Sequence, residues 1–282
     1  MPNNEKQWSS AEPGLLIIMI DQSGSMRSPY NGNSTRTEFA SQAINHVIDE
    51  IIQKNYNGDK PKNRCFISVI GYNHNISEIK SGWLDDFDAN PLRIKTVKKK
   101  IADGAGGLVE IDYEMPIWVE PIQKDGATNM KGAFEVAKEL CSKWMSDNVD
   151  CPAPVIINIS DGRPYYDRKD FQVCMDETIQ VAKEIMSLSN SDGNVLIFNA
   201  EIGDEGSSVV FPKEEVAVAS RGEGARFLFQ ITSVVPQGYA DAAKKNNLPL
   251  VEGARGCIFA AKAEELIGLI DFGSTKGHAD LH

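Results

Sequence analysis

The sequence contains few of the residues that build transition-metal or disulfide sites. Among its 282 residues are only four histidines, and none lies near a cysteine pair, so we do not expect a zinc site. The five cysteines are odd in number, widely scattered and free of any CxxC pair, which favours reduced thiols in a cytoplasmic protein over a disulfide framework. The histidines are His46, His74, His278 and His282, and the cysteines are Cys65, Cys141, Cys151, Cys174 and Cys257.

Long hydrophobic runs are also missing. Residues 1–14 are polar, and the apolar run that follows covers only 15–20. A signal peptide needs a longer apolar stretch behind a basic start, and a membrane span needs about 20 apolar residues. We therefore expect a cytoplasmic protein with no membrane partner.

Basic residues are outnumbered by acidic ones, 29 against 40. The formal net charge is −11, which argues against a nucleic-acid partner because phosphate backbones are held by clustered Lys and Arg. One basic run exists at 95–100 (KTVKKK), and we interpret it as the solvated face of a helix.

What the chain does have is an alternation of short apolar runs and amphipathic stretches. Hydrophobic residues make up 41% and charged residues 24%, enough for one large core. The alternation predicts an α/β fold, Rossmann-like, with a mostly parallel central sheet and helices on both faces. We divide the chain into an N-terminal tail (1–12), one domain (13–272) with an insertion at about 83–125, and a C-terminal tail (273–282).

The apolar periodicity predicts the individual elements. Strands are expected at 15–20, 65–71, 75–80, 109–115, 155–159, 195–202, 227–231 and 256–260, with 75–80 forming a hairpin on 65–71. Helices are expected at 40–52, 91–101, 130–146, 170–189, 237–246 and 263–271. Thr37 is expected to cap the first helix, and Gly58 and Pro61 to end it.

The insertion contains two tryptophans and several acids. Trp83 and Trp118 are expected to form a small core of the insertion. The acids are expected to line the polar face of a twisted strand and its flanks; they are Glu110, Asp112, Glu114, Glu120 and Asp125.

Three loops are expected at one edge of the sheet. Asp21, Ser23 and Ser25 follow the first buried strand, Asp161 follows the strand at 155–159, and Thr128 precedes a helix. In an open parallel sheet, the loops at the carboxyl ends of the strands gather at one edge, where ligands bind. Two carboxylates and three hydroxyls are oxygen ligands, which suit a hard cation. We predict a Mg²⁺ site, although Mn²⁺ and Ca²⁺ suit the same ligands. The alternative is that these residues serve only as turn and capping residues.

These motifs resemble those of von Willebrand factor A (vWA) domains. Asp21-Gln22-Ser23-Gly24-Ser25 matches the family's DxSxS motif, 126–129 is similar to the loop that supplies a threonine, and 160–162 is similar to the loop that supplies an aspartate. The resemblance implies a metal-ion-dependent adhesion site in which a partner's acidic side chain completes the metal shell. The closing segment resembles stand-alone bacterial members of the tellurium-resistance-associated type, which implies a protein partner such as a kinase, a phosphatase or a AAA+ ATPase.

Enzymatic activity is not expected. An aspartate nucleophile of the phosphotransferase kind needs a second acid two residues on, where this chain has Ser23. The GxSxG elbow of serine hydrolases is missing around Ser23, and no histidine lies near a triad position. A metal-dependent hydrolase or phosphatase remains the alternative function. More carboxylates in the three loops, or a second ion about 4 Å away, would favour it.

Overall fold

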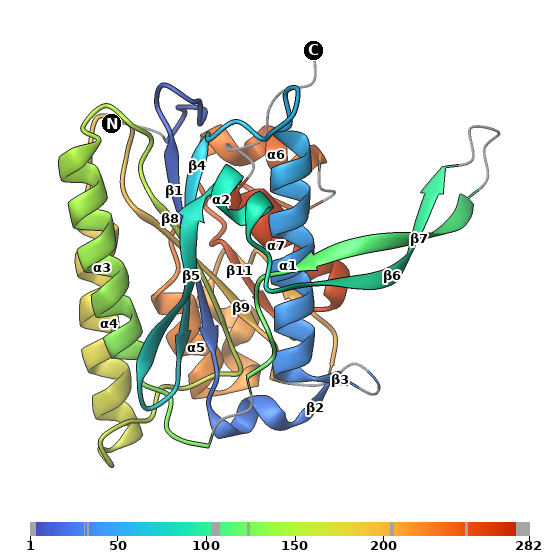
Figure 1. The fold of residues 1–282 in the computed structure, drawn as a ribbon. Helices are drawn as coiled ribbons and strands as arrows, with labels where there is room; N and C mark the ends of the chain where they lie inside the picture. The colour runs from blue at the N-terminus through green and yellow to red at the C-terminus, as the bar shows by residue number, and fades with distance from the viewer. Residues whose placement is uncertain are drawn as a thin grey trace.

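The computed structural model describes residues 4–30, 32, 34–102, 108–122, 125–203, 206–245 and 248–274. Its centre is a seven-stranded sheet in the order β10-β11-β9-β8-β1-β4-β5 (Figure 1). The inner strands run parallel, and only the edge strands β5 and β10 are antiparallel to their neighbours. The strands are β1 (Gly14–Asp21), β4 (Cys65–Tyr72), β5 (Ile76–Trp83), β8 (Val155–Ser160), β9 (Leu196–Glu201), β10 (Val209–Val210) and β11 (Cys257–Phe259).

Helices cover both faces of this sheet, as the alternation of the sequence predicts. Strand β1 is buried along its whole length, and its side chains alternate between two hydrophobic cores. One core lies under α1 (Arg36–Lys54) and α7 (Ala263–Ser274), and the other lies under α3 (Met130–Asp147), α4 (Phe171–Ser187) and α5 (Glu223–Gln230). The predicted mostly parallel α/β fold is confirmed.

Helix α1 begins with a capping box, two residues before the cap that we predicted. Thr35 is the N-cap: its hydroxyl accepts the Glu38 N–H, and the Glu38 carboxylate accepts the Thr35 N–H at 2.7 Å. The prediction of Thr37 was wrong: Glu38 stands three residues after Thr35 and completes a capping box there, whereas Ala40 stands at that spacing from Thr37. Thr37 lies within the helix, buried, and donates to the Ile122 carbonyl. The helix ends at Lys54, ahead of Gly58.

The helix predicted at 91–101 is a strand. β6 (Arg93–Ala102) pairs with β7 (Leu108–Ile117), which confirms the strand predicted at 109–115, and the two form a ribbon that projects from the side of α1 (Figure 1). β-branched residues at Ile94, Thr96 and Val97 favour the extended form once a partner strand is available. The basic run therefore lies on a strand and not on a helix.

The strand predicted at 227–231 is a helix. A short apolar run cannot be assigned from periodicity alone. In α5, Arg226 and Gln230 are exposed four residues apart while Phe227, Leu228 and Phe229 are buried, so the segment is amphipathic with a helical period.

The remaining elements are short. They are η1 (Gly24–Arg27), β2 (Pro29–Tyr30), β3 (Ser34–Thr35), α2 (Leu84–Ala89), η2 (Glu215–Arg221), η3 (Gln237–Tyr239) and α6 (Ala240–Lys245). None of the helices built from the described residues is long and apolar enough to cross a membrane.

The two tryptophans of the insertion have different surroundings. Trp118 is buried beside Phe87 and donates to the Phe87 carbonyl at 2.7 Å, as expected for a core of the insertion. Trp83 instead packs on Phe66 and Trp144, on the main body, so its predicted place was wrong. Sequence proximity misled here because Trp83 ends β5 and faces away from α1.

The N-terminal residues pack on the domain. Trp8 is 1% exposed, and its indole lies so close to Gly14 that a Cβ there would approach it within 2.1 Å. The Asn4 side chain donates to the Asn194 carbonyl at 2.8 Å. Gly14 is therefore the residue type that lets the start of β1 pass under Trp8.

Candidate metal centre

The three predicted loops meet at the carboxyl edge of the sheet. Ile20 of β1 pairs with Ile159 of β8, so the two loops that follow these strands start side by side. The loop at 126–129 is hydrogen-bonded to each of these two loops. Thr128 exchanges backbone hydrogen bonds with Tyr165 at 2.7 and 3.0 Å, and Gly24 N–H donates to the Gly126 carbonyl at 3.4 Å. The topology therefore gathers Asp21, Ser23, Ser25, Thr128 and Asp161 at one edge.

Asp21 is the deepest of these residues, fully buried at the end of β1. Its Oδ1 accepts the Ser23 N–H at 2.8 Å, whereas its Oδ2 has no hydrogen-bond partner among the described residues. The hydroxyls of Ser23 and Ser25 lie 3.1 Å apart. Ser23 and Thr128 are nearly buried and Ser25 is exposed, so the cluster runs from the core to the surface.

The site is short of positive charge. Burial, together with the nearby Asp161 carboxylate, raises the pKa of Asp21 from 3.8 to about 7, although hydrogen bonds from Ser23 and the charge of Arg36 oppose the shift. An unpartnered carboxylate oxygen in the interior is costly unless a cation or a proton satisfies it. The raised pKa of Asp21 has the same cause, which is a buried carboxylate without enough compensating positive charge beside it.

Arg36 is a site residue that sequence reasoning missed. Its guanidinium pairs with Asp161 Oδ2 at 2.6 Å, and it also donates to the carbonyls of Gly203 and, at 3.5 Å, Ser25. The side chains of Arg36 and Asp161 are both largely buried, at 18% and 9% exposed. The one signal in the sequence that could have identified Arg36 was its position as the first residue of α1, the helix that follows the DxSxS loop. Arg36 thus fixes the carboxylate of the third loop.

Replacing Arg36 with Met should destabilise the metal-free protein at neutral pH by about 3 kcal/mol, since it leaves two neighbouring carboxylates without a counter-charge. Urea unfolding with and without saturating Mg²⁺ measures this, and Mg²⁺ should recover much of the loss. Arg27→Met is the matched control. Arg27 pairs with Asp125 on the surface, where both side chains are exposed, so its loss should cost less than about 1 kcal/mol. Equal losses for the two variants would contradict the assigned role.

Glu201 is a second residue that we did not predict. It ends β9 in register with Ser160, and its carboxylate accepts the N–H groups of Gly203 at 2.6 Å and Ala260 at 2.8 Å. The sequence signal that could have identified Glu201 was an acidic residue at the end of the buried strand β9. Its hydrogen bonds tie the end of β9 to the loop after β11, behind Asp161.

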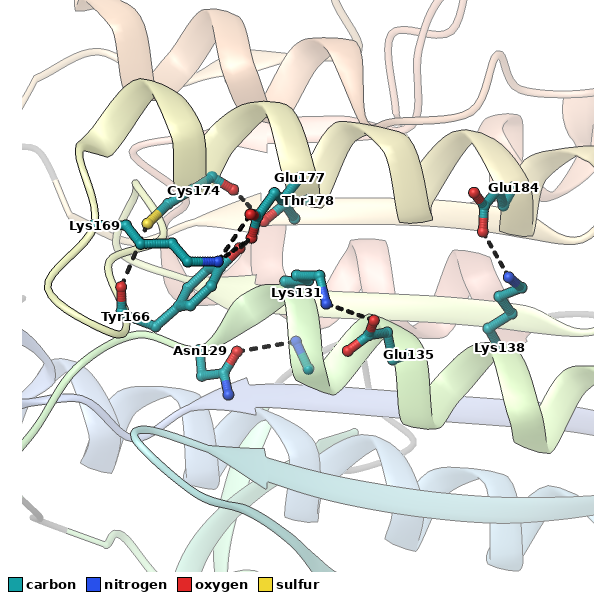
Figure 2. A network of polar contacts seen from close by, with 11 residues as sticks. Asn129, Lys131, Glu135, Lys138, Tyr166, Lys169, Cys174, Glu177, Thr178 and Glu184 are labelled. Atoms are coloured by element: carbon teal, nitrogen blue, oxygen red, sulfur yellow. Dashed lines mark hydrogen bonds and ion pairs between the residues drawn. The ribbon is translucent and has the colours of Figure 1, made fainter.

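Polar contacts hold the second and third loops against α3 and α4 (Figure 2). The Asn129 side chain caps α3 by accepting the Gly132 N–H at 3.0 Å. Beyond the third loop, Tyr166 and Lys169 both reach the Glu177 carboxylate, at 2.5 and 2.8 Å. The hydroxyl- and carboxylate-bearing loops are therefore braced from outside the site.

The donor set fits a hard divalent cation. Asp21 Oδ2 lacks a partner, the Ser23 and Ser25 hydroxyls converge, and every candidate ligand offers oxygen. Across the residues that the structure describes, there is no group of three or more His, Cys, Asp and Glu side chains placed to hold a metal. The fit therefore rests on two carboxylates supported by hydroxyls.

Fold and site together define a doubly wound α/β domain with a candidate cation site at the carboxyl ends of its strands. No protein-family model matches the sequence, and no curated protein matches it. Solved structures that resemble it include BatB from Bacteroides thetaiotaomicron, at 15% identity over 67% of this chain and 66% of that one, with a TM-score of 0.37. They also include the ArnB paralog VWA2 from Sulfolobus acidocaldarius, at 18% identity over 70% and 37%, with a TM-score of 0.37. The PilB minor pilin from Streptococcus sanguinis matches at 11% identity over 94% and 61%, with a TM-score of 0.48.

This chain spans less than two thirds of the length of each of those structures. At these identities and TM-scores, nothing about the ligands or partners of this chain follows from the likeness.

Proposed function

We propose that this protein is a vWA-type interaction module, which binds an acidic side chain of a protein partner through a Mg²⁺ ion held by the three loops. The observation that carries the proposal is the buried Asp21 Oδ2, which has no hydrogen-bond partner among the described residues. It lies in a cluster whose Ser23 and Ser25 hydroxyls converge and whose second carboxylate, Asp161, is close enough to raise the pKa of Asp21.

The five residues divide the work. Ser23, Ser25 and Thr128 supply neutral hydroxyl ligands, and Asp21 and Asp161 supply charge, directly or through bound water. The two carboxylates carry two negative charges, of which the Arg36 guanidinium already offsets part at Asp161. When bound, the cation supplies an electrophilic position for one more oxygen ligand. Arg36 keeps Asp161 in place, because it bonds both that carboxylate and the backbone carbonyl of Gly203, in the loop after β9.

The proposed approach of a partner is from the side of the third loop, where the candidate ligand Asp161 lines a cavity. A polar cavity of about 340 Å³ opens beside Asp161 and is also lined by Glu201, Arg163 and Arg221. We propose a cytoplasmic partner in a bacterial complex, with a kinase, a phosphatase or a AAA+ ATPase as the candidates that the family resemblance implies. Tellurium-resistance-type systems are the proposed context.

A metal-dependent hydrolase or phosphatase is the second candidate function. Asp21 is the observation in its favour, since a strand-end carboxylate with a pKa of about 7 has the protonation behaviour of a general base. Turnover of p-nitrophenyl phosphate with Mn²⁺, lost in Asp21→Asn, would favour the enzyme. Turnover equal to the buffer blank in both proteins would favour the interaction module.

The metal site is tested with Thr128→Val, which removes a hydroxyl and keeps the side-chain volume. We expect Mn²⁺ affinity, measured from the free-ion electron paramagnetic resonance signal, to fall at least about tenfold. Thr37→Val is the matched control: Thr37 is also buried but lies in α1 outside the site, and the loss of its hydroxyl should leave Mn²⁺ binding unchanged. Wild-type affinity in Thr128→Val would remove the threonine from the site.

Acetate then probes the open position. If the ion keeps an exchangeable place for a carboxylate, acetate should lower the water-proton relaxation caused by bound Mn²⁺, and chloride should not. Tight Mn²⁺ binding with no acetate effect would preserve the metal site but overturn its role as an acceptor for acidic side chains.

A further inference from the structure

The ribbon formed by β6 and β7 has two chemically different faces. Side chains alternate along each strand, so the pairing register assigns every residue to one face. Lys95 stands opposite Met115, Val97 opposite Tyr113, and Lys99 opposite Ile111. We name this side the inner face; its described members are Arg93, Lys95, Val97, Lys99, Val109, Ile111, Tyr113, Met115 and Ile117.

The outer face holds all the carboxylates of the described ribbon residues. These are Glu110, Asp112 and Glu114. Asp112 neutralises the lysine opposite it, Lys98, at 2.6 Å. The outer face thus carries the acids and a cross-strand ion pair, besides Ile94, Thr96 and Pro116. The inner face carries apolar and basic side chains without an acid.

The body of the protein covers only the base of the inner face. There Met115 and Ile117 are 7% and 8% exposed against α1, and the Tyr113 hydroxyl donates to Asp49 at 2.7 Å. Further out, Val109 and Ile111 are 44% and 36% exposed. A strand with this strict alternation is built to bury one face, and here the burial stops halfway.

A cleft continues the inner face into the body. It has a volume of about 360 Å³ and lies between the ribbon, α1 and α7, lined by apolar residues that include Phe39, Met115 and Ile267. Lys95 is the one lysine, and no Asp or Glu is present, among the residues that line it. The cleft therefore offers apolar space with a cation at its rim, on a protein whose net charge is −11.

The lysines of the inner face lack carboxylate partners. Neither Lys95 nor Lys99 forms an ion pair within the described parts of the chain, and the Lys99 ammonium lies over the Tyr113 ring at 4.3 Å. Glu38 and Glu120 act on Lys95 only at longer range. A second copy of the ribbon would bring no acid on its own inner face, so two inner faces do not complement each other.

We propose that the inner face of the ribbon and the cleft at its base dock an extended segment of a partner protein in which apolar and acidic side chains alternate. The apolar side chains cover Val109 and Ile111 and enter the cleft, and the carboxylates meet Lys99 and Lys95. This surface is separate from the metal centre and does not depend on it.

The test uses a phage-displayed library of random dodecapeptides selected against the full chain in the presence of a metal chelator. We expect enrichment of peptides that combine acidic with apolar residues. For a synthetic peptide from that selection, Ile111→Ser should weaken binding at least about tenfold, and Lys99→Gln by about three- to tenfold. The matched controls are their sequence neighbours on the outer face, Asp112→Ser and Lys98→Gln, which should change affinity less than twofold.

Four results would overturn the proposal. The first is that the selection yields basic peptides or no peptides, and the second is that inner-face and outer-face variants weaken binding equally. The third is a dimer in sedimentation that Ile111→Ser dissociates. The fourth is binding to phosphatidylcholine–phosphatidylserine vesicles that Ile111→Ser abolishes. Backbone hydrogen exchange in each variant checks that the ribbon is still formed, and protection of β6 and β7 on peptide addition would locate the binding.

Discussion

Replacing Asp21 with Asn should weaken Mg²⁺ binding by two orders of magnitude or more and, in the same protein, remove a pH-dependent cost to the metal-free fold. The first effect follows because Asp21 supplies one of two charges at the site, and its Oδ2 has no other described partner. The second follows because the carboxylate is fully buried beside Asp161. One substitution therefore tests both the ligand role and the electrostatic account.

The sign of the pH effect follows from proton linkage. Asp21 has a pKa of about 7 in the folded chain against 3.8 as a model value, so the folded state holds its proton over a range where the unfolded state has lost it. The unfolding free energy of the metal-free protein therefore falls as pH rises from about 4 to about 7 and is level above that, with a total near 4 kcal/mol at about 1.4 kcal/mol per pKa unit.

Urea unfolding with chelator at pH 5 and pH 8 measures this. Between those values, the difference in stability between Asp21→Asn and wild type should change by roughly 2–3 kcal/mol in favour of the variant. In saturating Mg²⁺ the ion compensates the charge, and the pH dependence of wild type should shrink. Asp192→Asn is the control for metal binding, since this buried carboxylate accepts the N–H groups of Lys6 and Ala153, away from the three loops. A parallel pH dependence in wild type and Asp21→Asn would show that Asp21 is ionised without penalty.

The sequence allowed the central sheet and the positions of the three loops to be predicted, for a physical reason. Strands such as β1 and β8 are buried on both faces, so they appear as unbroken apolar runs, and the polar residues that end them stand out. Asp21 and Asp161 were found in this way. In a parallel sheet the carboxyl ends share an edge, so their meeting needed no knowledge of side-chain geometry.

The errors concern elements whose surroundings decide their form. β6 is a strand because β7 lies beside it, and α5 is a helix because its buried residues face the sheet from one side. Arg36 and Glu201 were missed for a related reason: a charged residue at an element boundary looks solvated until the fold shows which loop it meets. The periodicity of the sequence does not reveal which distant residues a charged or polar side chain will contact.

Asn45 is the strongest case of such a hidden partner. It lies on the apolar face of α1, between Ala43 and Val47, and is 3% exposed. Its Oδ1 accepts the N–H groups of Trp118 at 2.8 Å and Val119 at 3.0 Å. Its Nδ2 donates to the Val119 carbonyl at 2.8 Å and, within the helix, to Ser41 at 2.9 Å. The side-chain amide of Asn45 thus satisfies backbone groups of Trp118 and Val119, which follow β7 and have no neighbouring strand among the described residues to bond to.

Asn45→Ala should therefore destabilise the protein by about 3–5 kcal/mol, because it leaves the buried N–H groups of Trp118 and Val119 without acceptors at about 1–3 kcal/mol each, besides the bonds lost. Urea unfolding measures the loss, and hydrogen exchange should show the Trp118 and Val119 amides losing protection first. Gln42→Ala, an exposed neighbour on α1, should stay within about 0.5 kcal/mol of wild type. A loss below about 1 kcal/mol in Asn45→Ala would mean that water replaces the amide and that this segment is open to solvent.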